Sequence, residues 1–125
     1  MQDTREKTKK EKQRLGYMNR DMQRTVIKII IMWKLKENGE MYAYAILKDI
    51  KKIKHPFIKD NPQIKNEVYN TLKALEQAGY IKEKSRRGNK HVKVYYELTK
   101  EGISALKATK SLLHETARSM ARILG

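Results

Sequence analysis

Cysteine, long hydrophobic runs and the residue patterns of enzymes are absent from this 125-residue sequence. Without cysteine, disulfides, thiol redox sensing and cysteine-ligated metal sites are excluded. The densest apolar stretch, residues 26–35, is interrupted by Lys28 and Lys34 and is too short to span a membrane. Because the N-terminus is charged throughout, we expect no secretory signal and a cytoplasmic location.

Catalytic and metal-binding patterns are missing as well. We find no nucleophile–base pair, no glycine-rich phosphate loop and no metal-ligand spacing. The three histidines are scattered along the chain. We therefore expect the protein to be no enzyme and to hold neither a metal ion nor a cofactor.

Acidic residues are few, since 14 Asp and Glu stand against 29 Lys and Arg and give a formal net charge of +15. The basic excess is concentrated in residues 1–20, 48–65 and 82–93. Such clustering predicts a polyanionic partner, although a basic surface can also serve solubility alone. With 39% hydrophobic residues, the chain is long enough for one small domain with a modest core.

Residues 62–79 carry the apolar repeat of an amphipathic helix, in Ile64, Val68, Leu72 and Leu75. Asn61 is predicted to cap this helix, Pro62 to occupy its first position and Gly79 to end it. A neighbouring face carries side chains that suit hydrogen bonding to base edges in a major groove: Gln63, Asn66, Asn70, Lys73 and Gln77. The alternative is an ordinary solvated helix face.

Residues 80–99 predict a basic β-hairpin that turns at residues 87–90. After the turn, apolar and polar residues alternate, with Val92, Val94, Tyr96 and Leu98 on one face and Lys93, Tyr95 and Glu97 on the other. The tip could hold phosphates beside a helix that enters a groove, or the lysines could only prevent strand-to-strand aggregation. The predicted DNA-backbone contacts are Lys65, Tyr69, Arg86, Arg87, Lys90 and Lys93.

Residues 22–38 are predicted to form the first helix, capped by Asp21 and ended by residues 38–39. Its apolar residues make two stripes, one with Val26, Ile29, Ile30 and Trp33, the other with Ile27, Ile31 and Leu35. A domain this small cannot surround a helix, so we expect one stripe to pack within the domain and the other on a partner chain. Trp33 is most simply a core anchor.

The basic residues 1–20 have almost no apolar periodicity, so we expect an arm that is disordered or loosely helical until something binds it. A role on the phosphate backbone and no role at all remain equally open. Residues 42–52 are predicted to form the second helix, with Phe57 and Ile58 adding a short strand to the hairpin. The core-facing positions of this helix are Ala43, Ile46, Leu47 and Ile50.

Residues 100–124 are predicted to form the last helix, with Thr99 as its cap. A heptad seam passes through Ile103, Leu106, Lys110, Leu113, Ala117, Met120 and Leu124. The helix is longer than a small domain needs, so this seam is expected to pair with another helix, either in the same chain or in a second copy. The predicted dimerisation residues are Ile27, Ile31, Leu106, Leu113, Met120 and Leu124.

Two segments of the sequence resemble the PadR-type winged-helix transcriptional regulators. Residues 68–81 (VYNTLKALEQAGYI) are similar to that family's YxxLxxLExxG helix, and residues 94–102 (VYYELTKEG) to its yYxLTxxG pattern. Residues 42–47 resemble the hGYeIl pattern, with Ala43 in place of the usual glycine, and residues 52–65 match poorly. MarR- and ArsR-type relatives share part of the pattern.

The resemblance implies a mainly α fold with a small β-hairpin wing, a winged helix-turn-helix with a long C-terminal dimerisation helix. The chain would divide into an arm (1–20), a DNA-binding domain (21–99) and a dimerisation helix (100–125). The leading hypothesis is a homodimeric, sequence-specific regulator of double-stranded DNA, expected to be a repressor. A small-molecule effector, which relatives often use, is left unidentified. The alternatives are a non-specific, chromatin-like nucleic-acid-binding protein and a winged-helix module that binds proteins.

Overall fold

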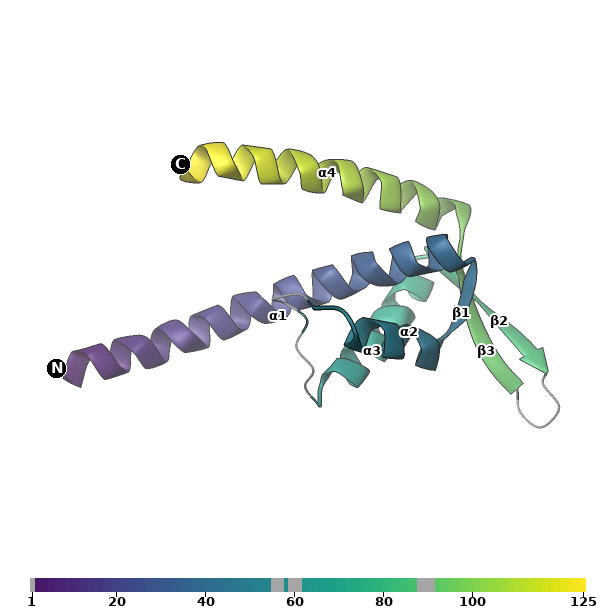
Figure 1. The fold of residues 1–125 in the computed structure, drawn as a ribbon, viewed down its shortest axis with the longest axis horizontal. Coiled ribbons are helices and arrows are strands. Elements are labelled where there is room, and N and C mark those ends of the chain that lie inside the picture. The colour runs from purple at the N-terminus through teal and green to yellow at the C-terminus, as the bar shows by residue number, and fades with distance from the viewer. Residues whose placement is uncertain (1, 55–57, 59–61, 88–91) are drawn as a thin grey trace.

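The computed structural model describes residues 2–54, 58, 62–87 and 92–125, and for residues 2–19, 86, 87 and 92 it describes the backbone alone. Four helices and three strands follow one another as α1 (Gln2–Asn38), β1 (Glu40–Tyr42), α2 (Ala43–Lys51), α3 (Ile64–Gln77), β2 (Ile81–Arg87), β3 (Val92–Leu98) and α4 (Lys100–Leu124). The predicted mainly α fold with a small β-hairpin is confirmed (Figure 1).

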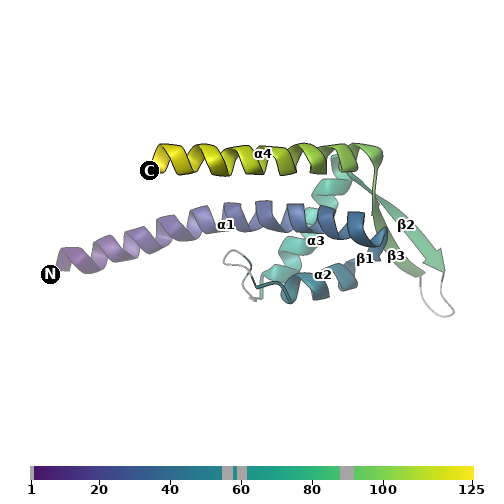
Figure 2. The same ribbon diagram turned by 45° about the horizontal axis from the view of Figure 1, so that its top comes forward.

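Helix α1 lies between α4 on one side and α2 on the other, with the sheet near its C-terminal end (Figures 1 and 2). It begins at Gln2, so the predicted start at residue 22 is wrong. The backbone of residues 2–20 continues the helix past the rest of the domain. The predicted end is confirmed, because Gly39 has φ 83° and donates its N–H to the Leu35 carbonyl at 2.9 Å.

The core is built from one face of each helix of the domain. Ile27, Ile31 and Leu35 of α1 are at most 1% exposed, and they meet the buried faces of α2 and α3. The core positions of those two helices are confirmed: Ile46, Leu47, Ile50, Ile64, Val68, Leu72 and Leu75. Each fully buried aliphatic side chain contributes about 1.5–3 kcal/mol, so this cluster fixes how α1, α2 and α3 are rotated.

Only one of the two apolar stripes of α1 packs into the core, and this bears on two predictions, one for Ile27 and Ile31 and one for Trp33. Ile27 and Ile31 are wholly buried within the single chain, so their assignment to a dimer interface is wrong. Trp33 belongs to the opposite stripe and is 49% exposed, so it is not a core anchor. Both stripes are equally apolar, and only the positions of α2 and α3 determine which of them is covered.

The sheet is antiparallel, in the order β1-β3-β2. Strands β2 and β3 form the predicted hairpin, with Ile81 opposite Leu98 and Arg87 opposite Val92. The third strand is β1, which pairs Met41 with Tyr96 and precedes α2. Of the short strand predicted at residues 57–58, Ile58 lies in a β-bridge and is buried, and Phe57 lies outside the described residues.

Helix α3 begins at Ile64, two residues later than predicted, and Gln63 at its N-cap position makes no side-chain cap. The predicted cap, Asn61, lies outside the described residues. The predicted end is confirmed. Gly79 has φ 80°, its N–H donates to the Glu76 carbonyl, and the next N–H donates to the Leu75 carbonyl, each at 3.0 Å. This pair of bonds is the Schellman motif, which favours glycine.

Candidate nucleic-acid interface

The outward face of α3 carries the amide and lysine side chains that the sequence predicted as base readers. Because Ile64, Val68, Leu72 and Leu75 are buried on one side, the helix can present only its other side to solvent. The structure brings the predicted residues together there, all of them exposed: Gln63, Asn66, Asn70 and Lys73. Helix α3 is 14 residues long, or about 20 Å, and a major groove about 12 Å wide admits such a helix.

Two predicted backbone contacts flank this face. Lys65 is exposed, and Tyr69 is 40% exposed although it is aromatic. Both lie on the same helix as the amides, so a ligand that covers the amide face would meet them at its margin. Lysine and tyrosine are common donors to phosphate oxygens.

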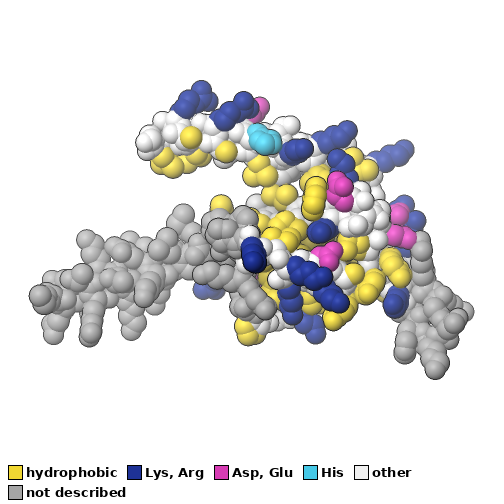
Figure 3. Space-filling view, in the orientation of Figure 1, with side chains coloured by type: hydrophobic (Ala, Val, Ile, Leu, Met, Phe, Trp, Pro, Cys, Tyr) yellow, Lys and Arg dark blue, Asp and Glu magenta, His cyan; other side chains and the backbone are white. Residues whose placement is uncertain are grey.

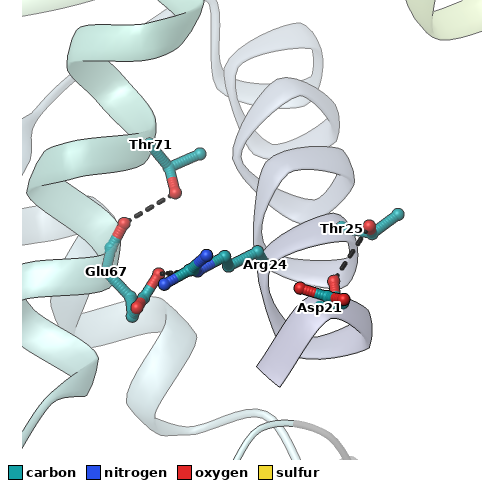
Figure 4. Close-up of polar contacts among 5 residues, drawn as sticks. All are labelled: Asp21, Arg24, Thr25, Glu67 and Thr71. Atoms are coloured by element: carbon teal, nitrogen blue, oxygen red, sulfur yellow. Dashed lines mark hydrogen bonds and ion pairs between the residues drawn. The ribbon is translucent and has the colours of Figure 1, made fainter. Parts of the chain in front are cut away.

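The other flank of α3 holds an ion pair that the sequence gave no sign of. Glu67 Oε2 lies 3.4 Å from Nε of Arg24, which extends from α1 (Figure 4). The backbone carbonyl of Glu67 also accepts a 2.6 Å hydrogen bond from the Thr71 hydroxyl, which satisfies this buried polar side chain. The partners are 43 residues apart in sequence, and only the packing of α1 on α3 brings them together.

The outward face of the sheet carries charged side chains of β2 and β3 that stand opposite one another. Strand alternation places Lys93, Tyr95 and Glu97 on this face, opposite lysines of β2. Nζ of Lys82 and Nζ of Lys84 lie 3.0 and 3.1 Å from the two carboxylate oxygens of Glu97. These hydrogen bonds hold the pKa of Glu97 below its ordinary value. Two of the hairpin's basic residues therefore share one carboxylate on the next strand, which offsets one of their two positive charges.

Lys93 is held differently, against an aromatic pair. The rings of Tyr42 and Tyr95 meet edge to face with centroids 5.7 Å apart, and Lys93 Nζ lies 4.8 Å from the Tyr42 centroid. This contact favours the cation without neutralising it, and Lys93 remains exposed. The side chains of Arg86 and Arg87 and the whole of Lys90 lie outside the description, so their predicted phosphate contacts remain predictions.

On the inward face of the sheet, Tyr96 packs against the core. Burial raises the pKa of Tyr96, and the carboxylates of Glu83 and Glu76 add to the rise. The packing of Tyr96 against the core anchors the hairpin to the helices.

A second exposed surface lies between α1 and α4. Hydrophobic side chains gather on the side of α4 that faces α1, and basic side chains on its other side (Figure 3). Leu106 is 8% exposed and belongs to the core, so it is not a free dimerisation residue as predicted. The predicted seam residues beyond it are exposed: Leu113 at 46%, Met120 at 42% and Leu124 at 76%.

Between the two helices lies a cavity of about 310 Å³, lined by apolar residues that include Trp33 and by lysines at its rim. Leu112 and Ile123 are also strongly exposed, at 62% and 71%, and the predicted seam did not include them. A plain list of apolar positions on this helix, without the heptad assumption, would have found them.

Within the described ranges, no group of three or more His, Asp or Glu side chains could hold a metal ion. None of the described helices has a stretch that is both long and apolar enough to cross a bilayer.

A sequence model of a protein family, the transcriptional regulator PadR-like family, matches residues 31–108, which is more than half of the chain. The chain belongs to the PadR-like family. Within this family's winged-helix architecture, we refer to α3 as the recognition helix and to the β2–β3 hairpin as the wing.

Solved structures of transcriptional regulators share the fold. A PadR family regulator from Eggerthella lenta superimposes with a TM-score of 0.70 at 19% identity, over 91% of this chain and 95% of its own. A transcriptional regulator from Clostridium thermocellum is 29% identical, with a TM-score of 0.65 over 82% of this chain and 93% of its own.

Bacillus subtilis PadR in complex with operator DNA gives a TM-score of 0.52 at 26% identity, over 66% of this chain and 45% of its own. A comparison with curated proteins gives no significant match.

Proposed function

We propose that this PadR-like chain forms a homodimer that binds a specific double-stranded DNA operator in the cytoplasm and represses transcription. The observation that carries the proposal is the exposed row of amide and lysine side chains on the recognition helix. Membership of the family supports a regulatory role. The complex of the Bacillus subtilis relative with operator DNA supports double-stranded DNA as the ligand.

In this proposal the recognition helix enters the major groove and reads bases through Gln63, Asn66, Asn70 and Lys73. An asparagine amide can donate to and accept from one adenine at the same time, which makes Asn70 and Asn66 the strongest readers. The wing and the margins of α3 hold the sugar-phosphate backbone through Lys65, Tyr69, Arg86, Arg87, Lys90 and Lys93. Such contacts fix the register without reading sequence.

The exposed apolar side of α4 supports the dimer. Leu113, Met120 and Leu124 form a seam that water would otherwise cover, and large apolar patches on soluble proteins commonly mark interfaces. Two-fold symmetry then requires an inverted-repeat operator, with half-sites about one helical turn apart or a multiple of it. The cavity beside Trp33 is our candidate for a small-molecule effector site.

The test is selection of bound duplexes from a random pool by the full chain, followed by footprinting on the selected sequence. We expect an inverted repeat and one discrete protected site. Even protection along the duplex would favour the second candidate, a non-specific chromatin-like protein, for which the net charge of +15 is the supporting observation. Absence of salt-sensitive binding would favour a protein-binding module instead.

A further inference from the structure

We propose that Arg24 is a positioning residue for base recognition, which orients the first two turns of the recognition helix through Glu67. The inference rests on the proposed DNA-binding function. It assigns a role to a residue of α1, a helix that carries none of the predicted base readers.

The first turn of the recognition helix is not capped by the side chain of its N-cap residue. Gln63 at the N-cap position supplies no side-chain cap, so the first turn keeps N–H groups without a cap from that residue. Yet Gln63 and Asn66, two of the four expected base readers, lie in this turn. Ile64 and Val68 bury the inner side of the helix and set its rotation against the core. An ion pair on the flank adds a directional contact, which non-directional aliphatic packing does not supply.

The ion pair between Arg24 and Glu67 supplies a directional contact at this place. The two atoms are 3.4 Å apart, and the Glu67 side chain is only 21% exposed, whereas that of Arg24 is 60% exposed. Figure 4 shows the Arg24 side chain crossing from α1 to the flank of α3. Among the described residues, this is the ion pair that joins these two helices.

Glu67 lies beside the predicted base readers, so a small rotation of the recognition helix at this place would displace their side chains. Glu67 follows Asn66 directly and precedes Asn70 by three residues, so all three lie within about one helical turn. A rotation of about 10° would move a side-chain tip about 6 Å from the axis by about 1 Å. Hydrogen bonds to base edges weaken steeply with such displacements, whereas phosphate contacts tolerate them.

The size of the expected effect follows from the exposure of the pair. Partly exposed ion pairs change an equilibrium by roughly two- to fivefold. We expect loss of the pair to lower, by that factor, the ratio of the affinities for the selected operator and for a scrambled duplex of equal length. The thermal midpoint of the protein should stay nearly unchanged, because the core below does not depend on the pair.

The chain offers a matched control on the same helix. Lys34 Nζ lies 3.6 Å from Asp49 Oδ2, so it joins α1 to α2 and leaves the recognition helix untouched. Lys34→Gln removes one positive charge from α1, as does Arg24→Gln. A loss of specificity through general weakening of α1 would therefore appear in both variants.

The experiment measures operator and scrambled-duplex affinities of full-length variants across a series of salt concentrations. Arg24→Gln and Glu67→Gln should each lower the affinity ratio two- to fivefold, although they change the net charge in opposite directions. The exchanged pair, Arg24→Glu with Glu67→Arg, should restore the ratio. Lys34→Gln should leave it unchanged.

Three results would overturn the inference while leaving the proposed function intact. The ratio could be unaffected in both pair variants. Arg24→Gln could weaken both duplexes equally and reduce the salt slope by about one ion, which would make Arg24 a phosphate contact. Lys34→Gln could lower the ratio as much as Arg24→Gln. Failure of the proposed function is distinct, since the wild-type chain would then show no preferred duplex.

Discussion

The hydroxyl of Thr99 donates a 2.6 Å hydrogen bond to the carbonyl oxygen of Gly79, and so ties the start of α4 to the end of the recognition helix. The same hydroxyl accepts from the N–H of Gly102 at 3.0 Å, which confirms Thr99 as the cap of α4. The N–H of Thr99 donates to the Tyr80 carbonyl at 3.0 Å. One residue therefore joins the element that carries the predicted base readers to the element that carries the exposed apolar seam.

Replacing Thr99 with valine should destabilise the protein by about 1–2 kcal/mol, because it removes the helix cap and a tertiary hydrogen bond while keeping the side-chain volume. Thr99→Ser keeps the hydroxyl and is the control. Urea unfolding followed by circular dichroism measures the difference. Equal stability of the valine and serine variants would show that the hydroxyl contributes nothing.

Gly102 is buried at the same junction, where α4 passes closest to the turn after the recognition helix. A Cβ at this position would overlap the carbonyl oxygen of Tyr80 and touch Leu98. Gly102→Ala should therefore cost about 1–3 kcal/mol through overpacking, despite a gain of up to about 1 kcal/mol in helix propensity. Thermal unfolding checks it, with Ser104→Ala on the exposed side of α4 as the control. A stabilised Gly102→Ala variant would contradict the close contact.

The features predicted correctly from the sequence are those with local causes. The apolar repeat of α3, the glycine that ends it, the alternation of β3 and the cap of α4 each depend on residues within a few positions of one another. The errors have non-local causes. Both stripes of α1 are apolar, and only packing against α2 and α3 buries Ile27 and Ile31 while it exposes Trp33. Strand β1 exists because β3 offers it a free edge.

In the candidate site as well, features with local causes were predicted from the sequence, and contacts between separate elements were not. Exposure of the amide row followed from the period of α3, because burying one face exposes the opposite one. The partners of Glu67 and Glu97 did not follow, since each pair joins separate elements. Counting lysines along the wing treated every one of them as free, and the fold pairs two of them with one carboxylate.

Asn70→Ala should relax base preference at one operator position by about 1–3 kcal/mol if its amide makes two hydrogen bonds to a base. Competition between the selected operator and single-base variants measures the effect. Replacing both Arg86 and Arg87 with alanine gives the contrast, because lost phosphate contacts should weaken all duplexes alike and flatten the salt dependence. Unchanged base preference in Asn70→Ala would mean that another face of the helix reads the DNA.

Glu97→Gln should strengthen binding to duplexes of any sequence and steepen its salt dependence, because Lys82 and Lys84 lose their carboxylate partner. Glu83→Gln changes the net charge equally on the opposite face of β2 and is the control. Titration at several salt concentrations measures both. If the two variants behave alike, the effect is one of net charge rather than of released lysines.

The same ion pairs predict a dependence on pH. Because the folded-state pKa of Glu97 is lowered, its contribution to stability is present above the ordinary glutamate pKa and is lost as pH falls through the lowered value. The stability difference between the wild type and Glu97→Gln should therefore disappear in acid. Urea midpoints measured from neutral pH down through this range test the sign.

Substitution of Ile31 should affect folding stability, whereas substitution of Leu113 should affect association of the chains, because Ile31 is buried in the single chain and Leu113 is exposed. Ile31→Ala should cost about 2–5 kcal/mol of folding stability through the cavity that it leaves. Leu113→Lys should keep the helical content of the protomer and shift the sedimentation equilibrium from dimer toward monomer, since a charge would replace an apolar contact at the seam.

Leu112→Lys is the matched control for the seam, since it makes the same chemical change one position away and about 100° around the helix. It should leave the proposed dimer intact. If Leu112→Lys dissociates the dimer and Leu113→Lys does not, the chains pair through the other exposed face of α4, where Ile123 also lies. That face points away from the seam, so the two half-sites of the operator would then be held in a different relative orientation.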